Sequence, residues 1–582
     1  MEFGLVAVAA VVLLVGASIL GSRIGVAAPL LLVVLGIGLG YLPFLPLIEV
    51  DPEIILLVVL PPLLYSAAVN VPLVDFRRNF RPVIGLSVIL VLLTALVVGF
   101  LLHLVVPAIP LPVAIALGAV ISPTDAVAAT SIGKRLGMPE RVVSILEGES
   151  LVNDATSLVL LKTALAAVAG TFVFWDAAGS FAYSVAVAVL IGALIGVVTV
   201  WIRAHLRNPI YDTMISFVVP FIAFIPAEAM HASGVLAVVI TGLYTGHHAS
   251  RRFSATARMN ERLNWRTVEF AVENGVFLLM GLQLHALVEQ TGDSAFRLEH
   301  TILIAVGLVI VLVICRAIFV FPLLGVQRRA ARRIAGKVEG VARLADRFRS
   351  REGVNTERLR RVEILEQRSQ ADLDHERDQQ LGWRDGVVLS WSGMRGVVTL
   401  AAAQTIPAEV PFRAQLILVA FGVAVITLLL HGLTLPPLIR KLWPNGTSNG
   451  DSAGELLSLS GDLIEAANEA IDDALAAADN APAPSELIVA KARASARMAL
   501  TPIVIRANGA KTAEAAAAAG AELDPVETPQ QTFMRLARIG LEAQRTALLE
   551  ERAIGRYSSR ALKKAEAALD SHETQLKAPP LT

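Results

Sequence analysis

The chain has 582 residues, of which 55% are hydrophobic and 17% charged, and its mean hydropathy is +0.64. This composition excludes an ordinary soluble domain and indicates an all-α polytopic membrane protein. Acidic and basic residues balance at 50 each, so the zero net charge does not favour a nucleic-acid partner. The one cysteine, Cys315, lies in an apolar stretch, which excludes a disulfide framework or a cysteine metal site.

Thirteen apolar stretches come close to the roughly 20 residues that a membrane-spanning helix needs. In chain order we predict spans near residues 2–20, 27–48, 53–70, 82–105, 110–132, 143–168, 180–202, 209–228, 233–247, 268–289, 300–325, 386–408 and 412–439. The first stretch has neither a basic start nor a convincing cleavage site, so we expect it to be retained rather than removed as a signal peptide.

The basic residues predict how the spans are oriented, because short cytoplasmic loops are enriched in Lys and Arg. The loops after odd-numbered spans carry most of them, namely Arg23; Arg77, Arg78 and Arg81; Lys134, Arg135 and Arg141; Arg203 and Arg207; and Arg251, Arg252, Arg258, Arg262 and Arg266. Loops after even-numbered spans, such as IEVDPE and PAIP, are poor in bases. We therefore expect the N-terminus outside and the C-terminus in the cytoplasm.

Two charged segments lie outside the predicted spans. Residues 1–442 are expected to form a transmembrane domain, interrupted at 327–385 by a segment dense in Arg and Glu. That segment is equally compatible with charged helices along the membrane and with a solvated linker. Residues 443–582 are expected to form a helical cytoplasmic tail without catalytic groups, ending in a helical hairpin that turns near Gly555.

Two of the predicted spans contain residues that break helices. The fifth reads ISPTDAVAATS, in which Pro123 removes a backbone donor, and the twelfth reads SWSGMRGVVTL, in which Gly393 and Gly396 flank Arg395. If spans 1–6 and 8–13 are two copies, their odd offset makes them inverted six-helix repeats, with broken helices 5 and 12 at matching places. Such a pair predicts an ion site at the middle of the membrane.

A polar stripe in the sixth span is the strongest candidate for that site. The motif GESLVND begins at Gly148, and helical spacing places its polar residues on one face, namely Glu149, Ser150, Asn153, Asp154 and the following Ser157. Ionisable groups at membrane depth are functional candidates, and such oxygen ligands suit a small hard cation. The alternative is a stripe that only bonds neighbouring helices.

Three motifs together, SPTDAVAATSIG, EGESLVNDATSLVL and SGMRGVVTLAAA, resemble the signature spans of bacterial sodium/proton exchangers of the NhaP and NHE type. The likeness to this monovalent cation:proton antiporter family extends from about Phe3 to Leu442. It includes AEAMHASGVLAVVITGLYTG and VENGVFLLMGLQL. It implies a homodimeric secondary transporter of the bacterial inner membrane that exchanges Na⁺, with Li⁺ as a further candidate, for H⁺. No enzymatic activity and no cofactor are implied.

The resemblance also implies roles for single residues in binding the cation and the proton. Asp154 matches the ion-binding aspartate, and Asn153 matches the asparagine of electroneutral exchangers. Ser150 and Thr124 match residues that help Asp154 to coordinate Na⁺. Asp125 matches the acid at the interruption of the fifth span, beside the half-helix ends.

Further charges are expected to support this site. The resemblance implies a buried ion pair between Glu149 and Arg395, and structural roles for Glu273 and Arg316. The chain departs from the pattern at Ser66, where some family members carry an acid in the third span. Whether the third span supplies a ligand therefore remains open.

One carboxylate that binds either a proton or a cation predicts electroneutral 1:1 exchange by alternating access. Potassium/proton exchange is an alternative, because oxygen ligands alone do not define ion size. A channel or sensor that shares the transporter fold is another. A membrane enzyme is disfavoured, because His103, His231 and His431 are scattered and form no HExxH motif.

Overall fold

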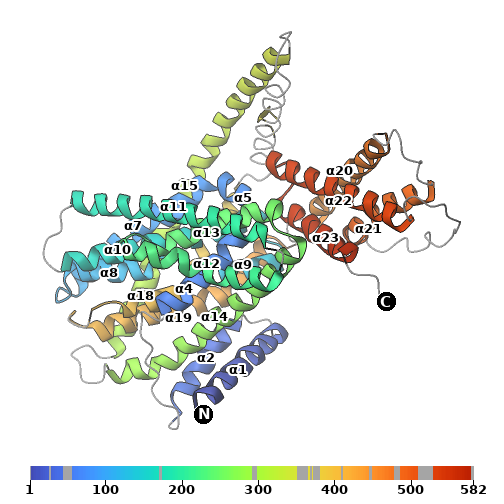
Figure 1. The fold of residues 1–582 in the computed structure, drawn as a ribbon. Helices are drawn as coiled ribbons and strands as arrows, with labels where there is room; N and C mark the ends of the chain where they lie inside the picture. Colours follow the sequence, from blue (N-terminus) through green and yellow to red (C-terminus); the bar gives the residue numbers. More distant parts are fainter. Residues whose placement is uncertain are drawn as a thin grey trace. The chain divides into compact units, whose positions relative to one another are not determined.

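The structure is a computed structural model, and among the residues that it describes the regular elements are all helical (Figure 1). It describes residues 2–24, 28–42, 55–168, 174–206, 208–290, 298–349, 365–366, 370, 381–407, 410–444, 449–476, 486–508 and 529–577. Contacts divide the chain into two compact units. The first comprises Met1–His248, Arg262–Ala330 and Gln379–Thr447, and the second comprises Ala249–Glu261, Ala331–Asp378 and Ser448–Thr582.

Nineteen helical elements precede the tail in the described part of the chain. They are α1 (Glu2–Ile24), α2 (Ala28–Gly40), the π-helical η1 (Ile55–Val59), α4 (Leu60–Asn70), α5 (Leu73–Arg78), α6 (Phe80–Ile84), the π-helical η2 (Gly85–Leu90), α7 (Val91–Val105), α8 (Leu111–Ile121), α9 (Val127–Leu136), α10 (Glu140–Val168), α11 (Phe174–His205), α12 (Pro209–Ala229), α13 (Gly234–Arg252), α14 (Ala255–Gln290), α15 (Leu298–Arg349), α17 (Trp383–Trp391), α18 (Val397–Gln404) and α19 (Arg413–Leu442).

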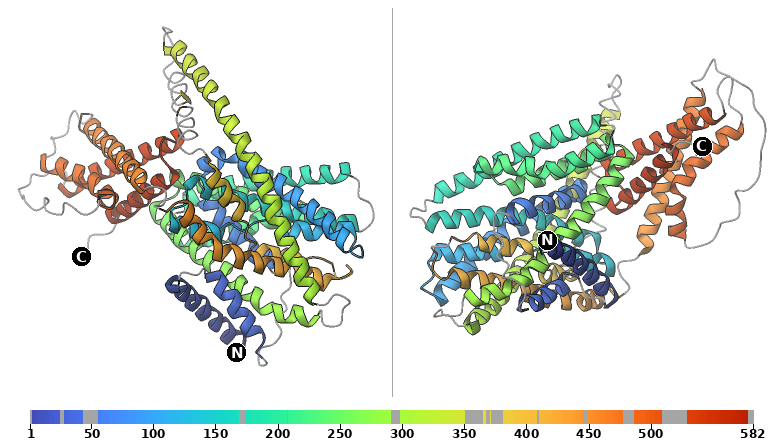
Figure 2. Two further views of the ribbon diagram at one scale, coloured as in Figure 1. Left: turned by 180° about the vertical axis from the view of Figure 1, so that it is seen from behind. Right: turned by 60° about the horizontal axis from the view of Figure 1, so that its bottom comes forward.

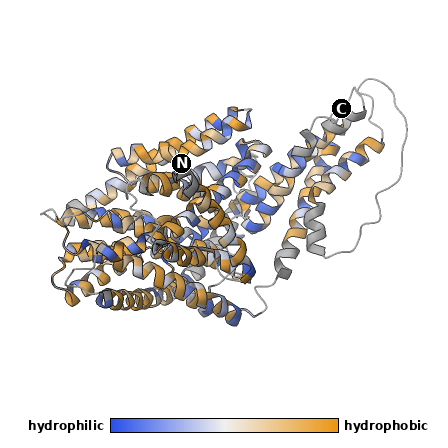
Figure 3. Cartoon of the chain, turned by 90° about the horizontal axis from the view of Figure 1, so that it is seen from below, coloured by the Kyte–Doolittle hydropathy of each residue, from blue (hydrophilic) through white to orange (hydrophobic). Residues whose placement is uncertain are grey.

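Seven helical stretches in the described part of the chain are long and apolar enough to cross a membrane. They are Phe80–Val105, Glu140–Val168, Ala178–His205, Pro209–Ala229, Ala255–Glu289, Glu299–Gln327 and Arg413–Leu442. Figure 3 shows hydrophobic residues dominating most helices of the first unit. Several other predicted spans correspond to shorter apolar helices, such as α2, or to interrupted ones. The all-helical membrane architecture is therefore confirmed, whereas the count of thirteen spans and the inverted repeat stay predictions.

Both predicted helix interruptions are present. The fifth span ends as a helix at Ile121 and resumes at Val127 as α9, because Pro123 cannot donate the next helical hydrogen bond. The twelfth span ends at Trp391 and resumes at Val397 as α18, with Gly396 in an extended conformation at the cap. Each interruption leaves backbone groups without helical partners in the middle of a predicted span.

Small residues bring α8 close to its neighbour α7. A methyl group at Gly99 would overlap Ile115 of α8, and one at Gly118 would overlap the backbone of Ala95. Such close approach is typical of helix packing in membranes. Helix α8 also packs against α10, where Ser157 donates a hydrogen bond to the carbonyl oxygen of Ala119 at 2.7 Å. The interruption after α8 is thereby placed against the polar face of α10.

The charged segments are helical where the structure describes them. Helix α15 continues past its apolar part to Arg349, so the segment expected at 327–385 begins as an extension of that span, and most of the remainder lies outside the described residues. The tail contains α20 (Asn449–Ala476), α21 (Glu486–Asn508), α22 (Pro529–Ile554) and α23 (Ser559–Lys577), which lie side by side (Figure 2). The expected hairpin is formed by α22 and α23, and Gly555 supplies the left-handed residue that ends α22.

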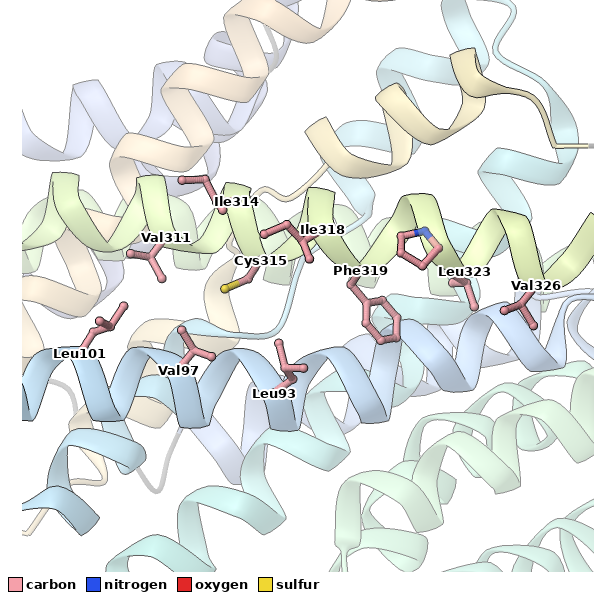
Figure 4. Close-up of a pocket in the computed structure, with 11 residues that line it drawn as sticks. Leu93, Val97, Leu101, Val311, Ile314, Cys315, Ile318, Phe319, Leu323 and Val326 are labelled. Atoms are coloured by element: carbon pink, nitrogen blue, oxygen red, sulfur yellow. The ribbon is translucent and has the colours of Figure 1, made fainter.

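An apolar cavity of about 680 Å³ lies between α7 and α15 (Figure 4). It is lined by Leu93, Val97, Leu101, Val311, Ile314, Cys315, Ile318, Phe319, Pro322, Leu323 and Val326. Every lining residue is apolar, so the cavity offers no ligand for an ion. The candidate ion site lies among the polar side chains of α10 and the two interrupted spans.

Candidate ion-binding site

The two helix interruptions meet each other and the polar face of α10. The backbone N–H of Asp125 donates to the carbonyl oxygen of Met394 at 2.8 Å, which joins the fifth and twelfth spans. The side-chain amide of Asn153 donates to the carbonyl oxygen of Thr124 at 2.9 Å and contacts its hydroxyl oxygen at 3.3 Å. Backbone groups freed by the interruptions are thus satisfied by one another and by α10.

Glu149 is held in a buried ion pair, and its partner is Arg316 of α15. Two guanidinium nitrogens of Arg316 donate to the two carboxylate oxygens at 2.5 and 2.8 Å, and the side chains are only 4% and 2% exposed. The Thr124 hydroxyl donates to the same carboxylate at 2.7 Å. A bidentate pair of this kind compensates the cost of burying both charges.

The prediction of an ion pair between Glu149 and Arg395 is therefore wrong, because Glu149 pairs with Arg316. Arg395 instead donates to the carbonyl oxygens of Ile121 at 2.8 Å and Ser122 at 3.3 Å, and also to that of Gly393. The first two carbonyls end α8 and have no helical partner, so they carry negative partial charge into the protein interior. The guanidinium group of Arg395 donates hydrogen bonds to these carbonyl oxygens, whereas that of Arg316 binds the Glu149 carboxylate.

Asp154 has no hydrogen bond and no ion pair among the described residues, although it lies only five positions after Glu149. It is partly exposed and lies within electrostatic reach of Asp125. The Asp125 carboxylate accepts a hydrogen bond from the backbone N–H of Val127 at 2.8 Å. Glu149 is therefore paired with an arginine, whereas Asp154 has no ion pair among the described residues.

The other predicted ligands lie around the same interruption. The Ser150 hydroxyl oxygen accepts a hydrogen bond from the backbone N–H of Ala126 at 3.4 Å, and Thr124 is buried. The side-chain oxygen of Asn153 is buried and has no hydrogen-bond partner among the described residues. A methyl group at Gly396 would overlap the Asp125 carboxylate, so the twelfth span approaches this acid closely.

Glu269 lies in none of the predicted site motifs, although the structure brings it into the same acidic group. Electrostatic interactions join Asp125 to Asp154, Glu269 and Glu273, and the two glutamates interact with each other. All four carboxylates belong to partly exposed residues. Glu269 lies one helical turn before Glu273 on α14, and that spacing is the signal that identifies it.

Comparison with known proteins identifies the family. Residues 8–441 match the family described as sodium/hydrogen exchanger, transmembrane. The chain belongs to this sodium/hydrogen exchanger family. YjcE of Escherichia coli K12, an uncharacterized Na⁺/H⁺ exchanger, is 30% identical over 430 residues, which cover 71% of this chain and 72% of YjcE.

Two further comparisons concern the substrates and the fold of similar proteins. A sodium, potassium, lithium and rubidium/H⁺ antiporter of Bacillus pumilus is 29% identical over 71% of this chain and 58% of its own length. The solved structure of the sodium/proton antiporter MjNhaP1 from Methanocaldococcus jannaschii matches with a TM-score of 0.55 at 18% identity. The match covers 76% of this chain and 99% of MjNhaP1. The exchanger fold predicted from the three motifs is thereby supported.

Membership of the sodium/hydrogen exchanger family makes this chain a polytopic membrane transporter rather than an enzyme. The family exchanges sodium ions for protons. The first unit contains most of the matched region, whereas the tail from Ser448 onwards lies outside it.

Proposed function

We propose that this exchanger moves one Na⁺ against one H⁺, with Asp154 as the carboxylate that binds each in turn. The observation that carries the proposal is the contrast between Glu149, locked by Arg316, and Asp154, which has no such partner among the described residues. An acid without a basic partner at membrane depth is costly unless it binds a cation or a proton. Competition for one carboxylate then couples the two ions.

Oxygen atoms near Asp154 supply the remaining coordination. We assign Ser150 and Thr124 as Na⁺ ligands, because hydroxyl oxygens suit a hard cation and both residues lie at the interruption of the fifth span. Asn153 positions this segment through its bond to the Thr124 carbonyl, and its unpartnered side-chain oxygen is a further acceptor. Asp125 adds negative charge beside the site.

The absence of a charge at position 153 supports electroneutral exchange. Asn153 is neutral, so the pair of adjacent positions 153 and 154 carries one ionisable group instead of two. A site that takes up one proton or one monovalent cation moves no net charge in a full cycle. Alternating access, in which the site opens to one side of the membrane at a time, completes the mechanism.

Potassium/proton exchange is the second candidate. The Bacillus pumilus relative carries potassium and rubidium in its name beside sodium and lithium. The ligands assigned here are all oxygen atoms, which accept any alkali cation, and ion size is selected by how rigidly they are held.

Resemblance to the family and the distribution of basic loops support three further proposals, on the location, the assembly and the orientation of the protein. We assign the exchanger to the bacterial inner membrane as a homodimer, with its N-terminus outside and its C-terminus in the cytoplasm. Single cysteines placed near Arg78 and near His300, in loops predicted on opposite sides, test the orientation with an impermeant thiol reagent in intact cells. Labelling of the position near Arg78 from outside would contradict it.

Reconstituted protein tests the function. Proteoliposomes with an acidic lumen should become alkaline inside when Na⁺ or Li⁺ is added outside, and parallel additions of K⁺ and Rb⁺ compare the two candidates. With Na⁺ as substrate and the voltage set by a potassium/valinomycin gradient, the rate should not depend on voltage. No response to any alkali cation would refute antiport, whereas a rate that changes steeply with voltage would refute only the one-for-one stoichiometry.

A further inference from the structure

Glu269 is an acid of α14 that the mechanism above does not use. The hydroxyl group of Ser66, a fully buried residue of α4, donates a hydrogen bond to its carboxylate at 2.9 Å. One turn earlier on α14, the buried Trp265 packs its ring 4.9 Å from Tyr65 of α4 and donates to Ser216 at 2.7 Å. Two successive turns of α14 are therefore fastened to α4, so the position of the Glu269 carboxylate is defined.

The charges around Glu269 come from several helices. Arg266 of α14, Lys134 of α9 and Glu147 of α10 interact with it electrostatically, as do Asp125 and Glu273. None of the described bases forms an ion pair with Glu269, whereas Lys134 is paired with Glu147 at 2.5 Å. Glu269 thus interacts both with these bases and with Asp125 and Glu273, and no ion pair with a described base neutralises its negative charge.

At position 66, α4 carries a serine rather than an acid. Its hydroxyl group binds a carboxylate that comes from α14. A negative charge therefore lies beside α4 but is supplied by another helix. Electrostatic interactions connect this carboxylate to Asp125, and Asp125 to Asp154.

We propose that Glu269, oriented by Ser66, attracts the cation on its way to Asp154. This inference rests on the proposed function of Asp154. Glu269 raises the local concentration of cations but does not itself exchange ions, so it acts on the apparent affinity for Na⁺ and leaves the maximal rate nearly unchanged.

Substitution of the acid tests this role in reconstituted full-length protein. Glu269→Gln keeps the size of the side chain and removes its charge, so the KM for Na⁺ should rise about fivefold, the scale expected for one partly screened charge near the path. Ser66→Ala leaves the charge but releases it, so the KM should rise less, by about twofold. Glu289→Gln, an exposed acid at the far end of the same helix, is the matched control and should leave the KM unchanged.

A relocated acid separates this role from a purely structural one. The double variant Ser66→Asp with Glu269→Gln moves the carboxylate from α14 to α4 and should return the KM to within about twofold of the wild-type value. An unchanged KM in Glu269→Gln, or a raised KM that the relocated acid does not lower, would overturn the inference. If Glu269→Gln does not fold, Ser66→Ala provides the test, and an unchanged KM for Na⁺ in that variant would overturn the inference.

The proposed function and this inference fail in different ways. A wild-type protein that moves no alkali cation refutes the proposed function. A wild-type protein that exchanges Na⁺, together with a Glu269→Gln variant of the same KM, refutes only the role of Glu269.

Discussion

Arg258, in the first turn of α14, forms a buried ion pair with Asp570 of α23, 312 residues further along the chain. Its Nε atom donates to the carboxylate at 3.1 Å, and the two side chains are 3% and 0% exposed. Arg545 of α22 donates to the same carboxylate at 3.0 Å. Residues 249–261, which include the connection between α13 and α14, therefore belong to the same compact unit as the tail.

Removal of Arg258 should loosen the contact between the tail and this connection. Arg258→Ala removes one of the two arginines that pair with the Asp570 carboxylate. Loss of one partner of a buried ion pair typically lowers the free energy of unfolding by about 3–5 kcal/mol. The loss should be smaller here because Arg545 still pairs with Asp570. Hydrogen–deuterium exchange in α23 should become faster. Sodium exchange should stay measurable with a changed pH dependence, because α14 also carries Glu269 and Glu273.

The matched control for Arg258 is Arg493→Ala. Arg493 pairs with Asp472, but the two side chains are 40% and 58% exposed, so this change should cost less than about 1 kcal/mol. Equal protection of α23 in the wild type and in Arg258→Ala would show that the buried pair does not hold the tail.

Glu566 should make the contact between α23 and residues 249–261 less stable at acidic pH. Burial alone would raise the pKa of this carboxyl group, but the charges of Arg552 and Arg258 and hydrogen bonds from Ser250 and Arg552 outweigh burial and lower it. A lowered folded-state pKa means that the stabilisation is complete above the unfolded-state value of about 4.3 and is lost as the pH falls through the folded-state value.

Substitution of Glu566 measures this contribution. Glu566→Gln should exchange hydrogen faster than the wild type in α23 at pH 7, and the difference should vanish when the pH falls well below about 4. Glu469→Gln, at an exposed position of α20, should match the wild type throughout. If the difference in exchange rate between Glu566→Gln and the wild type grew as the pH fell, the proposed stabilisation by ionised Glu566 would be contradicted.

The ion pair between Glu149 and Arg316 should be a main stabilising contact of the transmembrane helices. Arg316→Met and Glu149→Gln each leave one buried charge without its partner and should each cost about 3–5 kcal/mol, seen as a lower melting temperature in detergent. The double variant removes both charges and should be less destabilised than the sum of the two. Unchanged melting in both single variants would contradict the pair.

Gly396 should be needed for the close approach of the two interruptions. Gly396→Ala places a methyl group against the Asp125 carboxylate, so the exchange rate should fall by about tenfold or more, the effect of displacing a group in the site by a fraction of an ångström. Gly307→Ala, where a methyl group meets open space on α15, should behave as the wild type. Wild-type exchange in Gly396→Ala would show that the interruptions adjust freely.

Asp154 should be essential for binding but not for folding. Asp154→Asn keeps the size of the side chain and removes its charge, so binding of ²²Na⁺ and the release of a proton on binding should both disappear while the melting temperature is retained. Asn153→Asp is the companion variant, and we expect it to remain electroneutral because Glu149, Arg316 and Arg395 also influence how many protons the site holds. Sodium-dependent exchange in Asp154→Asn would refute the central assignment.

The sequence alone determined the features that depend on neighbouring residues. Pro123 and the glycines around Arg395 predicted both interruptions, because helix breaking is a local property of the backbone. The helical period placed the polar residues of GESLVND on one face of α10, and Gly555 predicted the turn of the tail hairpin. The three motifs were sufficient to indicate the family.

The tertiary structure decided which distant charges meet. Glu149 could pair with Arg395 or with Arg316 as far as the sequence shows, and the choice follows from the carbonyl groups at the end of α8, which bind Arg395. The contact of Glu269 with Ser66 likewise joins residues 203 positions apart. Such pairings depend on distances set by helix packing and on which neighbouring groups need a partner, and neither quantity is written in the local sequence.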